Sequence, residues 1–275
     1  MTPTMETLRL SLSEGIARIE FNRPDKANAI NARMWQELRE AMRWLDEKPA
    51  ARVGILCAAG RHFSAGLDLD LLVDLKAGID GPCGGRARER LRRTILDIQD
   101  TVTSIERCTK PVIAAVHAAC VGGGVDIIAA CDLRYCSEDA WFSVKEIDIG
   151  VVADVGTLQR LPRLIGEGMT RELAYTGRRV SGAQAQALRL VNRTYDSTDE
   201  LMRGVEDLAR TLASKSPLAL RGTKETITYA RDHSVADALH QVATWNAATM
   251  FSADLDEAVR ADAGVRGLSE RTYSI

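Results

Sequence analysis

Two segments of this chain follow the same order: a continuous apolar run, a glycine turn and then a helical pattern. The runs Val53–Ala58 and Pro111–Val116 contain almost no polar residue, which is typical of strands buried on both faces of a parallel sheet. The first run leads to a turn at Gly66, and the second leads to the three glycines Gly122–Gly124. Strands that alternate with helices in this way predict an α/β fold with much parallel pairing.

The alternation continues over the first two thirds of the 275-residue chain. Short segments punctuated by polar residues predict three more strands, at Ile16–Asn22, Leu133–Ser137 and Leu190–Thr194. Apolar residues at helical spacing, or a capping box, predict helices at Arg33–Lys48, at Arg88–Cys108 and after Ser181. The glycine-rich stretch 76–85 is expected to be a surface loop.

After about residue 196 the pattern changes to helices alone. The predicted helices are Glu200–Ser214, Pro217–Tyr229, Val235–Phe251 and Asp254–Ala263. We therefore expect a core over residues 1–196 that carries the active site and an all-helical oligomerisation region over residues 197–275. Exposed apolar faces on these helices would support an interface between subunits.

Composition and the absence of known motifs argue against several kinds of binding partner. A formal net charge of -2 provides no general attraction for nucleic acid, and no apolar stretch is long enough to cross a membrane. The six cysteines form no C-x-x-C pair, and no spacing of histidine and cysteine suggests a zinc site. No phosphate-binding loop of the GxxxxGK[ST] or GxGxxG type occurs. We expect no metal, no redox cofactor, no nucleic acid and no membrane among the partners.

The two ends of the chain contain no recognised targeting signal. The first ten residues lack the apolar block of a secretory signal, and Arg271–Ile275 is not a Ser-Lys-Leu ending. These observations lead to the expectation of a cytoplasmic, bacterial protein.

The triple-glycine turn also suggests the chemistry. Glycines let backbone N–H groups approach a ligand oxygen closely, and the helix predicted after Gly124 adds the positive end of its dipole. Such N–H groups can stabilise an oxyanion while carboxylates move the proton. The available carboxylates are Asp126, Glu146 and Asp154, so the combination suggests enolate chemistry. Taken alone, each acid also has a structural explanation, as a helix-terminal residue, a solvated strand end or a helix cap.

Four segments together resemble the crotonase (enoyl-CoA hydratase/isomerase) family over nearly the full length. They are Asn22–Ile30, Phe63–Asp68, Gly122–Asp126 and Thr157–Pro162. The resemblance implies a spiral of strand-strand-helix (ββα) turns, followed by helices that build a trimer, which in this family often stacks into a hexamer.

Further segments, including Phe142–Gly150 and Ala153–Thr157, are similar to the Δ3,5-Δ2,4-dienoyl-CoA isomerase subgroup. Hydratases of the family usually carry glutamates at the positions of Asp126 and Glu146, and glycine at the position of Asp154. The triplet found here is the one that the isomerase subgroup carries. It implies conversion of 3,5-dienoyl-CoA to 2,4-dienoyl-CoA in fatty-acid β-oxidation, with CoA as part of the substrate.

The resemblance also implies roles for individual residues. Glu146 would exchange a proton at C2 and Asp154 at C6, although the two could be reversed, and Asp126 would support the site. The backbone N–H groups of Leu67 and Gly123 would form the oxyanion hole. The segment that contacts the acyl-CoA would comprise Ala65, Gly66, Leu67, Asp68 and Leu69, together with Gly123.

Two other functions stay open at this point. One is hydration of 2-enoyl-CoA through Glu146. The other is a non-catalytic protein of the same fold that binds RNA through the basic run 86–93, although the near-neutral charge speaks against it. The four histidines are expected to be structural, because no G-x-S-x-G serine motif accompanies them.

Overall fold

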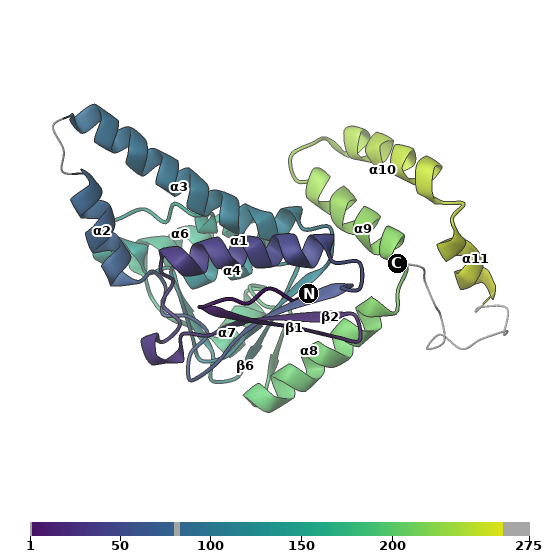
Figure 1. Ribbon diagram of the computed structural model, residues 1–275, viewed down its shortest axis with the longest axis horizontal. Coiled ribbons are helices and arrows are strands. Elements are labelled where there is room, and N and C mark those ends of the chain that lie inside the picture. Colours follow the sequence, from purple (N-terminus) through teal and green to yellow (C-terminus); the bar gives the residue numbers. More distant parts are fainter. Residues whose placement is uncertain (1, 80–82, 261–275) are drawn as a thin grey trace.

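A six-stranded sheet forms the centre of the computed structural model, which describes residues 2–79 and 83–260 (Figure 1). Its strands lie in the order β1-β2-β3-β4-β6-β9, and every neighbouring pair except β1–β2 is parallel. Their bounds are β1 Leu8–Ser13, β2 Ile16–Phe21, β3 Val53–Ala58, β4 Val112–Val116, β6 Leu133–Ser137 and β9 Arg193–Tyr195. The α/β class and the parallel pairing predicted from the sequence are confirmed.

A second, three-stranded sheet was not predicted. It consists of β5 Ala119–Val121, β7 Trp141–Ser143 and β8 Val180–Ser181. Strands of two or three residues are too short to show a period in the sequence, so only their long-range pairing reveals them. The predicted strand at Leu190–Thr194 lies further along the chain, because Leu190 and Val191 are buried in the core before β9 begins.

Helices cover the sheet and extend beyond it. Their bounds are α1 Ala32–Glu47, α2 Leu69–Ile79, α3 Gly84–Arg107, α4 Gly123–Ala130, α5 Thr157–Ile165, α6 Glu167–Thr176, α7 Gly182–Ala187, α8 Thr198–Ala213, α9 Pro217–Tyr229, α10 Val235–Thr249 and α11 Ala253–Arg260, with 3₁₀ turns at Pro24–Lys26 and Glu146–Ile149. The Ser181–Gln184 capping box is present at the start of α7. The loop predicted over 76–85 is wrong at both ends, where α2 and α3 are helical, and residues 80–82 lie outside the described ranges. The predicted helix Asp254–Ala263 likewise runs past the described residues.

Two cores hold the sheet between layers of helices. On one face, the larger core includes Leu38 of α1, Val102 of α3 and Ile127 of α4. On the other face, Leu201 and Val205 of α8 pack against β3 and β4. Helix α8 therefore packs with the sheet, although it follows residue 196, where we predicted the core to end. The division of the chain into two regions stays a prediction.

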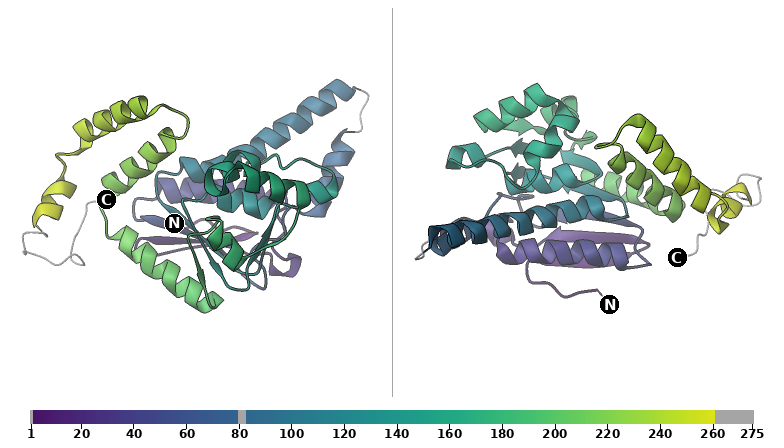
Figure 2. Two further views of the ribbon diagram at one scale, coloured as in Figure 1. Left: turned by 180° about the vertical axis from the view of Figure 1, so that it is seen from behind. Right: turned by 90° about the horizontal axis from the view of Figure 1, so that it is seen from above.

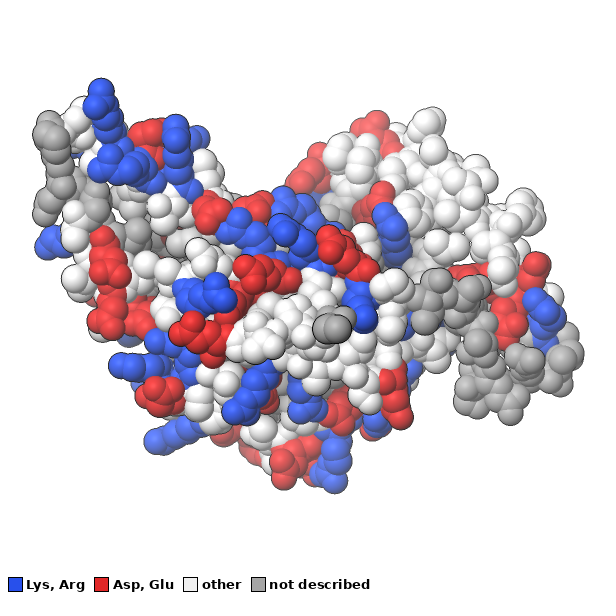
Figure 3. Space-filling view, viewed as in Figure 1, with Lys and Arg blue, Asp and Glu red and all other residues white. Residues whose placement is uncertain are grey.

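The last three helices form an arm that projects from the sheet (Figures 1 and 2). Its outer surface carries exposed apolar side chains: Val235, Leu239, Met250, Phe251 and Val259. In the space-filling view the same arm is largely free of charged groups over its upper part (Figure 3). An arm with this surface has the exposed apolar faces expected of an interface between subunits.

One buried lysine attaches the arm to the core. Lys224 of α9 donates hydrogen bonds to the carbonyl oxygens of Ile105 (3.2 Å) and Lys110 (3.0 Å) and to Asp132 Oδ2 (2.7 Å). Its side chain is only 8% exposed. Asp132 Oδ2 also accepts the N–H of Val112, so the same carboxylate contacts the start of β4 and the arm.

We expect Lys224→Met to destabilise the protein by about 2 kcal/mol, because it leaves buried acceptors without a donor while preserving the bulk of the side chain. Urea unfolding followed by circular dichroism measures the change. Arg171→Met is the control, since Arg171 pairs with Glu167 on the surface of α6 and exposed pairs contribute little. Equal midpoints for the two variants would contradict the anchoring role of Lys224.

Candidate active site

The two glycine turns predicted from the sequence meet in space. The N–H of Ser64 donates to the carbonyl of Ala119 (2.9 Å), and the N–H of Val121 donates to the carbonyl of Ser64 (3.0 Å). Gly66 has a φ of +92°, and a Cβ atom there would lie 2.9 Å from the Val121 carbonyl oxygen. Only glycine fits such a close approach at positive φ, which explains the residue type.

Buried polar residues that sequence analysis did not single out hold the first turn. Ser64 Oγ donates to the carbonyl of Asn28 and accepts the N–H of Gly66. The Asn28 side chain, which is fully buried, donates to the carbonyls of Ala59 and His62. Both residues lie inside the segments that carried the family resemblance, but their role as a frame depends on contacts between distant segments.

The two predicted oxyanion donors, Leu67 and Gly123, lie at positions where the local backbone pairing leaves their N–H groups over. Ile30 pairs with the backbone on either side of Leu67, accepting from Asp68 and donating to Gly66. Gly123 begins α4, where the first N–H groups have no partner within the helix. Among the described residues, neither the Leu67 N–H nor the Gly123 N–H has a hydrogen-bond acceptor. Two free N–H groups on adjoining turns can bind one carbonyl oxygen.

Glu146 lies against the second turn. It begins the 3₁₀ turn that follows β7, and a Cβ atom on Gly122 would lie 3.0 Å from Glu146 Oε1. Its other carboxyl oxygen, Oε2, is buried and has no hydrogen-bond partner among the described residues. Burial first, and then the negative charge of Asp126, raise the pKa of Glu146 to about 7. A carboxyl group with this pKa can take up or release a proton near neutral pH.

Asp126 is buried on α4. The side chain is 1% exposed, and Oδ1 accepts the N–H of Thr157 (2.5 Å) at the start of α5. Burial raises the pKa of Asp126 to about 6, and the charge of Asp154 contributes to the increase. The hydrogen bond from Thr157 fixes one oxygen, so Asp126 connects α4 to α5.

Asp154 completes the cluster from the loop before α5. The Gln99 side chain on α3 donates to the backbone carbonyl of Asp154 (2.6 Å). Asp154 is more exposed than Asp126, yet partial burial still raises its pKa. Its charge in turn contributes to the raised pKa values of Asp126 and Glu146. The charges of the three predicted acids therefore influence one another, although Asp154 and Glu146 line different cavities.

The remaining predicted contact residues differ in exposure. Ala65 and Leu69 are exposed at the turn, and Gly66 is buried behind it. The carboxylate of Asp68 is paired with Arg23 (2.8 Å), which holds the pKa of Asp68 below its usual value. Asp68 thus stabilises the turn through Arg23.

Two features of the described ranges, 2–79 and 83–260, bear on other functions. No helix there is both long and apolar enough to cross a membrane. No cluster of three histidine, cysteine or acidic side chains there is placed to hold a metal ion.

Curated relatives align over almost the whole chain. A protein of Arabidopsis thaliana named Delta(3,5)-Delta(2,4)-dienoyl-CoA isomerase, peroxisomal, is 47% identical over 94% of this chain and 93% of its own length. A human protein named Delta(3,5)-Delta(2,4)-dienoyl-CoA isomerase, mitochondrial, is 41% identical over 98% of this chain and 83% of its own length. Because these relatives are named for organelles, the cytoplasmic location predicted from the sequence is wrong. That prediction rested only on missing signals.

Solved structures and a family comparison agree with the fold. An enoyl-CoA hydratase from Bacillus anthracis superposes with a TM-score of 0.86 at 29% identity, covering 95% of this chain and 97% of that one. An enoyl-CoA hydratase from Mycobacterium smegmatis superposes with a TM-score of 0.82 at 28% identity, over 95% and 97% of the two chains. The sequence model of the enoyl-CoA hydratase/isomerase family matches residues 11–271. The chain therefore belongs to the enoyl-CoA hydratase/isomerase family and has its crotonase-like fold.

Proposed function

We propose that this protein is an isomerase that converts 3,5-dienoyl-CoA to 2,4-dienoyl-CoA in the oxidation of unsaturated fatty acids. One observation carries the proposal: Glu146 packs against the turn that presents the Gly123 N–H, and the charge of Asp154 acts on Glu146. Relatives at 41–47% identity bear the name of this activity, which supports it.

The geometry supports a two-step proton transfer. The thioester oxygen would accept the N–H groups of Leu67 and Gly123, which stabilises the negative charge as C2 loses a proton. Glu146 lies beside the same turn and would take that proton. The charge then spreads along the conjugated chain, and Asp154 would deliver a proton to C6. The exposed edge of the first turn, at Ala65 and Leu69, is the side on which CoA would lie.

Asp126 would act as a support for this reaction. Its oxygen is tied to the Thr157 N–H, and its charge raises the pKa of Glu146. Hydration of 2-enoyl-CoA would need two carboxylates to act together on one water molecule. Asp126 is poorly suited to be the second one, because its side chain is shorter than that of glutamate and one of its oxygens already accepts the Thr157 N–H. Every proton in the scheme moves through a side chain of this protein, so the scheme requires neither a metal nor a redox cofactor.

We expect Asp154→Asn to slow isomerisation by roughly 10²–10⁴-fold, because the amide cannot deliver a proton to C6. The rise in absorbance as the diene becomes conjugated to the thioester measures the rate. Asp148→Asn is the matched control, since Asp148 is paired with Lys145 on the surface two residues from Glu146. Full activity in Asp154→Asn would refute the role given to Asp154. Addition of water to crotonyl-CoA, without isomerisation, would instead indicate a hydratase.

The reaction should depend on pH near neutrality, because one of the two acids must be ionised while the other is protonated. At low pH both acids carry a proton, and above the pKa of Glu146, which is about 7, both lose it. We therefore expect kcat/KM of the wild-type enzyme to pass through a maximum and to fall on either side of it, whichever acid serves C2. A rate that is constant from pH 5 to pH 8 would contradict proton transfer by this pair.

We also propose that the arm assembles the protein into a trimer, or a hexamer of two trimers. The exposed apolar residues of the arm support this, with Leu239 of α10 63% exposed and Phe251 92% exposed. Apolar faces of this kind are usually covered in stable assemblies.

Native mass spectrometry should therefore give three or six times the 30.0 kDa chain mass. Leu239→Glu should shift the population toward monomer, because it places a charge on the apolar face. Arg203→Glu on α8, outside the arm, should leave the assembly intact. A wild-type monomer at micromolar concentration would refute the assembly.

A further inference from the structure

A polar cavity of about 580 Å³ lies between α3, α5 and α9, and Asp154 is one of its lining residues. Gln99 and Thr103 of α3 line one wall, and Gln159 and Arg160 of α5 line another. The cavity reaches the surface at Asp232, whose side chain is 71% exposed. Its volume is large enough for a chain of water molecules, each of which needs roughly 30 Å³ and polar partners.

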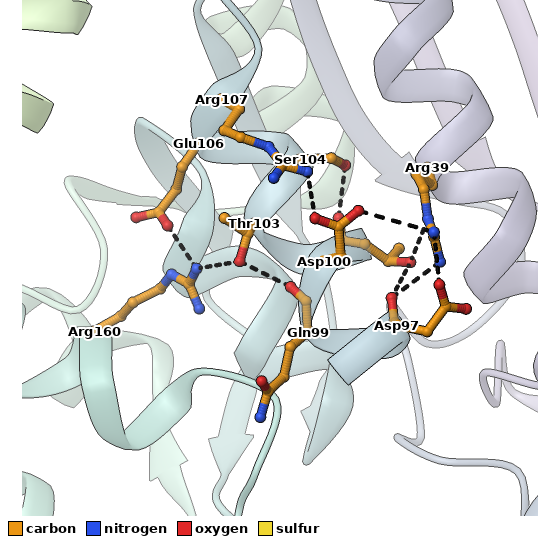
Figure 4. Close-up of polar contacts among 10 residues, drawn as sticks. Arg39, Asp97, Gln99, Asp100, Thr103, Ser104, Glu106, Arg107 and Arg160 are labelled. Atoms are coloured by element: carbon orange, nitrogen blue, oxygen red, sulfur yellow. Dashed lines mark hydrogen bonds and ion pairs between the residues drawn. The ribbon is translucent and has the colours of Figure 1, made fainter. Parts of the chain in front are cut away.

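The walls of this cavity are fixed by hydrogen bonds. Arg160 contacts Thr103 Oγ1 (3.3 Å) and pairs with Glu106 (2.5 Å), as Figure 4 shows. Arg231 of the arm pairs with the same glutamate, so the arm helps to close the wall. Because these groups are held in place, the cavity keeps its polar lining.

Glu146 lines a different cavity, of about 340 Å³, whose other walls are mostly apolar. One of its oxygens presses on the Gly122 backbone, and the other is buried without a hydrogen-bond partner among the described residues. Asp126, the acid between, has one oxygen engaged by Thr157. The described residues therefore provide no hydrogen-bonded path that carries a proton from Glu146 to Asp154.

Each turnover leaves Glu146 and Asp154 in protonation states that cannot start the next one. The C2–H bond breaks and its proton goes to Glu146, while the C6–H bond forms with the proton of Asp154. Afterwards Glu146 is protonated and Asp154 is ionised. Asp154 must gain a proton and Glu146 must lose one before another substrate can react.

We infer that the polar cavity between α3, α5 and α9 is the route by which water reprotonates Asp154. This inference rests on the proposed isomerase function. It means that the hydrogen added at C6 comes from solvent and not from C2. Glu146 then loses its proton separately, through the mouth of the active site after product leaves.

The origin of the hydrogen is tested with 3,5-dienoyl-CoA deuterated at C2, converted over many turnovers in ordinary water. We expect product whose C6 carries no deuterium from C2, as measured by NMR. Deuterium from C2 at C6 would show internal transfer and overturn the inference. A wild-type protein that forms no 2,4-dienoyl-CoA would refute the proposed function itself, so the two failures are distinct.

The route is tested by making the walls apolar with Thr103→Leu and, on the opposite wall, Gln159→Leu. The first turnover uses the proton already on Asp154, so its rate should match wild type, whereas later turnovers should slow several-fold. Rapid-mixing absorbance separates the two phases. Thr94→Leu, on the same helix but outside the cavity, should change neither. Equal rates in all variants, or equal slowing of both phases, would overturn the role of the cavity.

Discussion

The site depends on the backbone pairing between Ser64 and the segment Ala119–Val121. This short bridge brings the turn after β3 onto the turn after β4, although about 55 residues separate them in the chain. It is possible only because Gly66 lacks a side chain at the point of closest approach to Val121. Without this pairing the N–H groups of Leu67 and Gly123 could not bind the same oxygen, and the proposed enolate would not be stabilised.

The electrostatics of the site follow from the same packing. Closing the two turns buries Glu146 against Gly122 and Asp126 behind it, and burial is the main cause of their raised pKa values. Negative charges on neighbouring carboxyl groups repel one another, which lowers the stability of the folded protein when all of them are ionised. The same repulsion and burial give Asp126 and Glu146 pKa values near neutral pH. The more exposed Asp154 lines the polar cavity, whereas Glu146 lines a separate, mostly apolar one, so the two proposed proton-transfer groups differ in their access to water.

Much of this could be read from local sequence. Strands β3 and β4 have continuous apolar runs, and the structure places β3, β4 and β6 at the predicted residues. The glycine turn at Gly122 and the choice of Asp126 as a candidate site residue could be predicted from residue type alone. Other features depend on contacts that no local pattern encodes. The frame built by Asn28, the Lys224 anchor and the packing of α8 on the sheet join segments far apart in the chain.

For the glycine-rich stretch 76–85, local composition predicted a loop where the structure has the end of α2 and the start of α3. Gly84 and Gly85 are helical because they begin a long helix whose later residues pack on the core, and tertiary packing outweighs the low helix propensity of glycine. Family resemblance supplied the roles of Glu146 and Asp154, which stay a prediction.

The central claim is that the Leu67 and Gly123 N–H groups polarise a thioester carbonyl beside Glu146. Infrared difference spectroscopy of bound 2,4-dienoyl-CoA, labelled with ¹³C at the thioester carbonyl, tests it most directly. Two hydrogen bonds in a water-excluded site should shift the carbonyl stretch to a lower frequency than in water. A bound carbonyl with the same frequency as in solution would contradict the account.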